Sequence, residues 1–71
     1  MEILVFKTNI RYPRHISNIT PHLQSVAGVM KWKVELKDRD KILRIETLNV
    51  IPAFIESLLQ GAGYLCEELR D

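Results

Sequence analysis

The stretch VMKWKVELKDRDKILRIE, residues 29–46, decides the fold of this chain. Its first half alternates apolar and charged side chains with a period of two, which is typical of a strand with one buried and one exposed face. The polar turn DRD (38–40) follows, and KILRIE (41–46) resumes the alternation. We therefore predict a β-hairpin. In its first strand, Met30 is expected to point inward beside Trp32 and to fill the core.

Two apolar segments precede this hairpin. Residues 3–6 (ILVF) are apolar at four consecutive positions, which predicts an interior strand buried on both faces. In residues 11–28, apolar side chains recur at spacings of three and four until Gly28, which predicts a helix with one apolar face. Because Pro21 falls inside this pattern and lacks a backbone N–H, we expect the helix to be bent there.

A second helix and a short strand complete the pattern. Asn49 and Pro52 open the helix, and Gly61 or Gly63 ends it. Its apolar face is expected to consist of Phe54, Ile55, Leu58 and Leu59. The segment YLCEEL (64–69) is predicted to form the last strand. This order predicts an α+β ferredoxin-like βαββαβ sandwich, with a four-stranded antiparallel sheet and two helices on one face.

Length and charge narrow the class of protein. A chain of 71 residues has room for one domain, which we expect to span residues 1–71. A formal net charge of +1 is too small to attract nucleic acid or an anionic membrane through net charge, so neither is expected as a partner. The single cysteine cannot form an internal disulfide, which favours a cytoplasmic location.

The order of elements resembles the heavy-metal-associated (HMA) domain family. The resemblance is carried by Gly28-Val29 before the alternating strand, by the charged hairpin, and by Gly63-Tyr64 after the second helix. In that family a Gly-Met-x-Cys-x-x-Cys loop before the first helix binds soft ions such as copper(I) through two thiolates. Here residues 9–15 (NIRYPRH) occupy that loop, and Tyr12 and His15 stand where the family has its cysteines. The resemblance therefore implies the fold, while the family's thiolate pair is missing.

This departure leads to our main functional hypothesis from the sequence. We expect a non-catalytic interaction module that has lost thiolate metal binding, uses no cofactor, and binds a protein partner through the former metal loop. The residues expected to form the interaction loop are Arg11, Tyr12, Arg14, His15 and Tyr64. Recognisable arrangements of a nucleophile with a base, and glycine-rich phosphate loops, are missing from the sequence, so we do not expect an enzyme.

An alternative hypothesis is a divergent metal-ion carrier. In the predicted fold, the start of the first helix and the loop before the last strand lie at the same end of the sheet. His15 and Cys66 could therefore hold copper(I) or zinc together, with a further ligand from a second molecule.

The sheet face away from the helices is a second candidate interaction surface. Alternation places either Ile3 and Val5 or Leu4 and Phe6 there, and Ile42 is expected to join them. An exposed apolar patch of this kind favours a homodimer formed through the sheet face.

Overall fold

The computed structural model describes residues 1–69 and contains the six predicted elements in the predicted order. The strands and helices are β1 (Glu2–Thr8), α1 (Pro13–Gln24), β2 (Val29–Val34), β3 (Leu43–Thr47), α2 (Pro52–Gly61) and β4 (Cys66–Glu68). None of the helices among the described residues has the length and apolar character that a membrane span requires.

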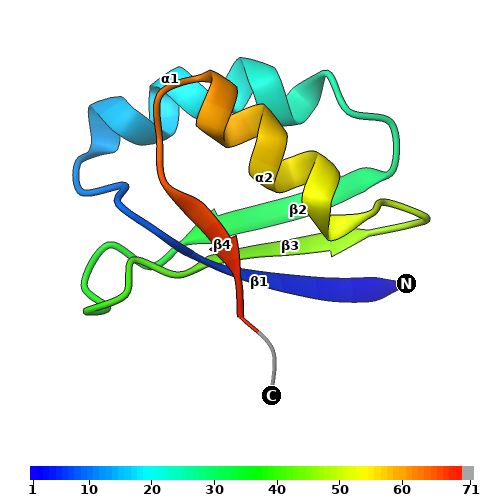
Figure 1. The fold of residues 1–71 in the computed structure, drawn as a ribbon, viewed down its shortest axis with the longest axis horizontal. Helices are drawn as coiled ribbons and strands as arrows, with labels where there is room; N and C mark the ends of the chain where they lie inside the picture. Colours follow the sequence, from blue (N-terminus) through cyan, green and yellow to red (C-terminus); the bar gives the residue numbers. More distant parts are fainter. Residues whose placement is uncertain (70–71) are drawn as a thin grey trace.

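The four strands form one antiparallel sheet in the order β2-β3-β1-β4. Both helices cover the same face of this sheet, and the opposite face is open (Figure 1). The predicted α+β ferredoxin-like sandwich is therefore confirmed. Strand β1 lies between β3 and β4, which confirms that it is an interior strand.

The core lies between the helices and the covered face of the sheet. Alternation along β1 and β3 sends every second side chain inward, so that Leu4 pairs with Ile45 and Phe6 pairs with Leu43. The helices contribute residues three to four positions apart on their inner faces. The fully buried apolar side chains are Phe6, Ile10, Ile19, Leu23, Leu43, Ile45, Ile55, Leu59 and Cys66.

The expectation that β1 is buried on both faces is wrong. Leu4 and Phe6 are buried, but Ile3 is 53 % exposed and Val5 is only half-buried. The physical reason is that both helices lie on one side of the sheet (Figure 1). The burial pattern of β1 accordingly leaves its odd-numbered residues on the open side.

Met30 does not fill the core as expected. The pairing of β2 with β3 shifts register between Val29 and Lys31, and Met30 is the extra residue of this irregularity. Its side chain is 60 % exposed, whereas Trp32 pairs with Ile45 and packs against the core. A bulge of this kind breaks the period of two on which the prediction rested. The strand also ends at Val34, earlier than predicted.

Two further burial predictions are wrong. Ile42 was expected on the open sheet face, but it precedes β3, lies outside the alternating strand and is buried. Phe54 was expected on the apolar face of the second helix, but it is 53 % exposed. Ile55 and Leu59 take the inward positions of α2, and Phe54 lies about 100° away from Ile55 around the helix axis.

The remaining differences concern the ends of elements. The final strand is shorter than the predicted segment 64–69, because Tyr64 and Leu65 form the connection from α2. There the backbone N–H of Tyr64 donates to Leu59 O, and that of Leu65 donates to the Asn9 side chain. Helix α1 starts at Pro13 and continues through Pro21 without interruption.

Candidate functional site

The loop between β1 and α1 is anchored at its start. The hydroxyl of Thr8 donates to Lys41 O in the β2–β3 connection and accepts from the backbone N–H of Ile10 at 3.2 Å. The side chain of Ile10 is fully buried. These contacts fix the direction in which the following residues leave the sheet.

Helix α1 begins after Tyr12, which occupies the N-cap position without making a side-chain cap hydrogen bond. Pro13 follows at the first helical position, where its missing N–H costs nothing. The usual N-cap residues are Ser, Thr, Asp and Asn, because their side chains accept from the exposed N–H groups of the first turn. Tyr12 gives up that stabilisation and leaves its ring 48 % exposed at the loop surface.

His15 is held between two tyrosines. Its ring meets Tyr12 at 5.2 Å and Tyr64 at 5.5 Å between centroids, edge to face in both cases. Its Nδ1 accepts from the backbone N–H of Arg11 at 3.1 Å. A neutral imidazole has one N–H, so this hydrogen bond places the proton on Nε2 and makes that atom a donor.

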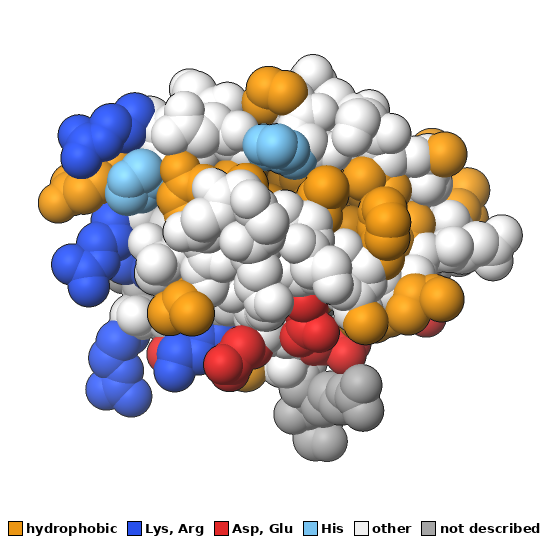
Figure 2. Space-filling view, turned by 45° about the horizontal axis from the view of Figure 1, so that its top comes forward, with side chains coloured by type: hydrophobic (Ala, Val, Ile, Leu, Met, Phe, Trp, Pro, Cys, Tyr) orange, Lys and Arg blue, Asp and Glu red, His pale blue; other side chains and the backbone are white. Residues whose placement is uncertain are grey.

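Arg14 completes the site by stacking on Tyr12, with its guanidinium carbon 4.6 Å from the ring centroid. The first turn of α1 contains no acidic residue, so the exposed N–H groups of the helix start add to the positive charge of Arg11 and Arg14. Basic side chains gather at this end of the molecule (Figure 2).

The structure thus brings the five predicted loop residues into one linked group. We call Arg11, Tyr12, Arg14, His15 and Tyr64 the loop cluster. The sequence analysis missed Asn18, whose side-chain NH₂ donates to the Tyr64 hydroxyl at 3.0 Å. Its spacing of three residues from His15 on the same helix was the available signal.

Cys66 lies away from this surface. It pairs with Thr8 on the covered face of the sheet and has no exposed area. Burial, followed by the nearby charge of Glu56, raises the pKa of the Cys66 thiol to about 12, which keeps it protonated at neutral pH. The thiolate is the form that binds metals, so this environment opposes the predicted role of Cys66 as a ligand.

The donor set for a metal is correspondingly incomplete. Within residues 1–69, no three His, Cys, Asp or Glu side chains lie close enough to hold a metal ion. In the loop, His15 is the one imidazole, and a metal at either ring nitrogen would disrupt the hydrogen bond from Arg11. The loop of this chain therefore does not fit a copper(I) or zinc site built from its own residues.

Comparison with known proteins identifies solved structures that share this fold. No protein-family model and no curated protein sequence matches the chain. Solved structures do. The copper(I)-loaded first domain of the human copper chaperone for SOD1 is 24 % identical and has a TM-score of 0.77, covering 93 % of this chain and 89 % of that one.

Two further solved structures have the same fold. The yeast copper transporter domain Ccc2a, solved in apo and copper(I)-loaded states, is 20 % identical with a TM-score of 0.85, over 100 % of this chain and 99 % of that one. The N-terminal domain of ZntA in its Zn(II) form is 23 % identical with a TM-score of 0.81, over 96 % and 92 %.

These likenesses define the class of the protein as a small βαββαβ domain. More narrowly, the chain has the fold of the heavy-metal-associated domains, as its sequence pattern implies. At these identities the likeness establishes the fold. It also corrects the expectation that no cofactor is involved, because structures of the same fold are copper(I)-loaded or in a Zn(II) form.

Proposed function

We propose that this chain is a non-catalytic, cytoplasmic docking domain whose loop cluster binds an acidic, acceptor-rich surface on a partner protein. The observation that carries this proposal is the fixed donor at His15. The backbone N–H of Arg11 keeps Nδ1 occupied, so Nε2–H can donate to a carboxylate or carbonyl oxygen. Arg14, stacked on Tyr12, adds a charged donor whose planar shape suits carboxylates.

The composition of the cluster supports a protein as the partner. Tyrosine and arginine are enriched in protein interfaces, where an aromatic ring supplies contact area at a small entropic cost. The rings of Tyr12, His15 and Tyr64 contact one another and are already held in place. Little conformational entropy would therefore be lost on binding. The basic charge at this end would steer an acidic partner toward it.

Replacing Arg14 with Gln tests this proposal. With a synthetic peptide of aspartate and glutamate as the probe, we expect amide shifts in NMR to centre on residues 11–18 and Tyr64. Arg14→Gln should weaken binding roughly 3- to 10-fold, because one charge-assisted contact is lost, and added salt should weaken it in the wild type.

Lys33→Gln is the matched control. It removes the same charge from an exposed position on the open sheet face, and it should leave the affinity nearly unchanged. Equal weakening by both substitutions, or shifts spread evenly over all basic residues, would show attraction to net charge alone and contradict the docking proposal.

A second candidate function is metal-ion carriage, which the comparisons favour more directly than docking. The solved structures with this fold include copper(I)- and zinc-bound forms, and His15 stands at a loop position that holds a cysteine in that family. Because the described residues 1–69 hold no complete donor set, a carrier role requires a shared site with ligands from a second molecule. Copper(I) or zinc would then be the cargo.

Titration with zinc and copper(I) against a competing chelator tests the carrier role. If it holds, metal binding should be lost in His15→Gln and kept in His22→Gln, which removes the exposed second histidine. The amide resonance of Arg11 must also shift, because His15 Nδ1 can no longer accept the hydrogen bond from the Arg11 N–H once a metal is bound to the imidazole. Metal binding that is unchanged in His15→Gln, or that does not shift the Arg11 amide resonance, would argue against this candidate.

A further inference from the structure

A groove of about 340 Å³ lies at the end of the molecule that carries the α1–β2 and β3–α2 connections. Its walls are residues 25–27, residues 49–51 and Phe54, and none of these residues is charged. The neighbouring Leu48 is held there by its backbone N–H, which donates to Gly28 O at 2.8 Å. We call this groove, with Leu48, the apolar end.

Large hydrophobic side chains stand exposed around this groove. Ile51 is 71 % exposed, Phe54 53 % and Leu48 47 %. Ile51 also occupies the N-cap position of α2 without a side-chain cap hydrogen bond, where Ser, Thr, Asp or Asn would stabilise the helix. An exposed isoleucine at an N-cap is unfavourable both for solubility and for the stability of the helix. Such locally unfavourable residues are common at contact surfaces.

The apolar end and the loop cluster lie at opposite ends of the molecule. In Figure 1 the N-terminus and the start of α2 are at one end, and the β1–α1 loop is at the other. Hydrophobic side chains gather toward the first end and basic side chains toward the second (Figure 2). A contact at the apolar end therefore leaves the loop cluster accessible.

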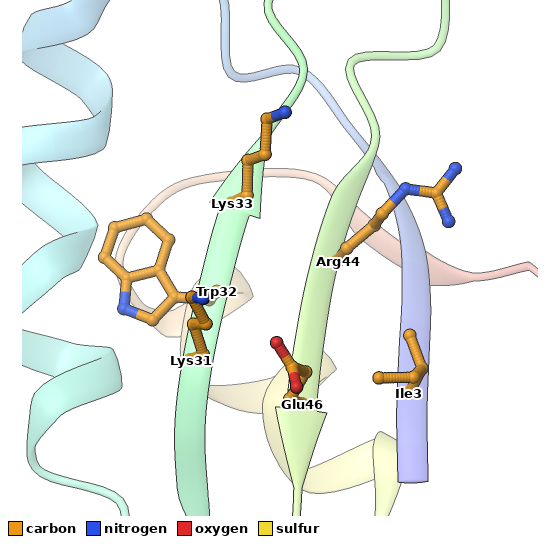
Figure 3. Close-up of a pocket in the computed structure, with 6 residues that line it drawn as sticks. All are labelled: Ile3, Lys31, Trp32, Lys33, Arg44 and Glu46. Carbon is orange, nitrogen blue, oxygen red and sulfur yellow. The ribbon is translucent and has the colours of Figure 1, made fainter.

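The open sheet face is less suited to a hydrophobic contact. Ile3 shares a hollow of about 290 Å³ there with Glu46 and Arg44, and lysines line its other side (Figure 3). Lys33 lies directly opposite Arg44, which is an unfavourable pair of like charges. Arg44 also forms an ion pair with Glu35, with 3.3 Å between Nε and Oε1. Packing two such faces together would bury several charges.

We propose that the apolar end is the contact surface between two copies of this chain, in place of the open sheet face. Protruding side chain and groove occur in the same uncharged patch, so a two-fold axis would let Phe54 of each copy enter the groove of the other. This arrangement also keeps the two basic loop clusters at the far ends, where they repel each other least.

The size of this end of the molecule limits the contact between two copies. The end of the molecule measures 28 × 18 Å between Cα extents, which limits the contact to at most about 500 Å² per copy, below the roughly 800 Å² per partner of stable complexes. We therefore expect a weak, reversible dimer that forms only at high protein concentration. Two loop clusters on one dimer would bind a partner with two sites more tightly than one cluster does.

Sedimentation equilibrium from micromolar to millimolar concentration tests this proposal. The wild type should show reversible dimerisation, and Phe54→Gln should weaken it at least 10-fold. Ile51→Ser should do the same, and because serine is a good N-cap, this variant should stay folded. Ile3→Thr is the control, because Ile3 is as exposed as Phe54 and threonine keeps the β-branch.

The outcomes separate the two surfaces. Weakening by Phe54→Gln and Ile51→Ser, with Ile3→Thr unchanged, supports dimerisation at the apolar end. A chain that stays monomeric at millimolar concentration overturns the proposal. Weakening by Ile3→Thr to the same extent as by Phe54→Gln also overturns it, because it would place the contact on the sheet face.

Discussion

Gly28→Ala is expected to destabilise the fold by about 3–5 kcal/mol, the largest effect expected among the three glycines of this chain. Gly28 has a φ of +97°, a conformation that costs an alanine about 1–2 kcal/mol. A Cβ there would also lie 2.4 Å from Leu48 O and 2.9 Å from Val50 Cγ2. The backbone oxygen cannot move without breaking the pairing between Gly28 and Leu48.

Two other glycines provide matched controls for this prediction. Gly63 has the same φ of +97° but no atom within 4 Å of an added Cβ, so Gly63→Ala should cost about 1–2 kcal/mol, the backbone cost alone. Gly61 ends α2 with open space around it, and Gly61→Ala should stabilise by about 0.5–1 kcal/mol. Urea unfolding of the three variants measures all of these values.

The ranking of the three variants is the decisive result. Equal losses for Gly28→Ala and Gly63→Ala would mean that the close approach to Leu48 contributes nothing. Small domains have an unfolding free energy of about 5–10 kcal/mol, so Gly28→Ala should remove a large share of it. The apolar end depends on this approach, because Val50 lines the groove and Leu48 directly precedes the lining residues 49–51 in the chain.

The fold could be predicted because its signals are local and agree with one another. Alternation in residues 29–34 and 43–47 defines the paired strands, and the spacing of Ile19 and Leu23 defines the inner face of α1. The sequence could not reveal the irregularity at Met30, because a bulge depends on how β2 pairs with β3 and leaves no fixed pattern in the chain.

The grouping of the loop residues with Tyr64 could be expected from the sequence, whereas the contact of Asn18 with Tyr64 and the hydrogen bonding of His15 could not. Four loop residues are near neighbours in the sequence, and the topology adds Tyr64 from the connection before β4. The proton position on His15 depends on one backbone N–H of Arg11, which no residue pattern specifies. The burial of Cys66 depends on its pairing with Thr8, and in a strand of three residues the pattern cannot fix that register.

The wild type is expected to lose up to about 4 kcal/mol of stability between pH 9 and pH 12 because of Cys66. Below pH 9 the thiol is protonated in both the folded and the unfolded state and has no effect. Above pH 9 the unfolded chain releases the proton, while burial holds the pKa of the folded thiol at about 12. The unfolded state is then favoured by about 1.4 kcal/mol for each further pH unit, until both states are ionised.

Cys66→Ala removes this dependence and serves as the control. The variant is expected to be less stable than the wild type at neutral pH, because it leaves a small cavity in the core. Its stability should fall less steeply above pH 9, and the difference between the two slopes isolates the thiol from the tyrosines and lysines that titrate nearby. Denaturant unfolding at intervals of pH, with a reductant present, measures both slopes.

Equal slopes would mean that the thiol ionises as easily in the folded chain as in the unfolded one. Burial would then place no extra barrier on loss of the thiol proton to a metal, which would strengthen the carrier role. A steeper slope for the wild type would instead mean that burial keeps the Cys66 thiol protonated in the folded chain, which opposes metal binding by Cys66. In that case His15 is the ligand that the β1–α1 loop can offer, and a partner molecule has to supply the others.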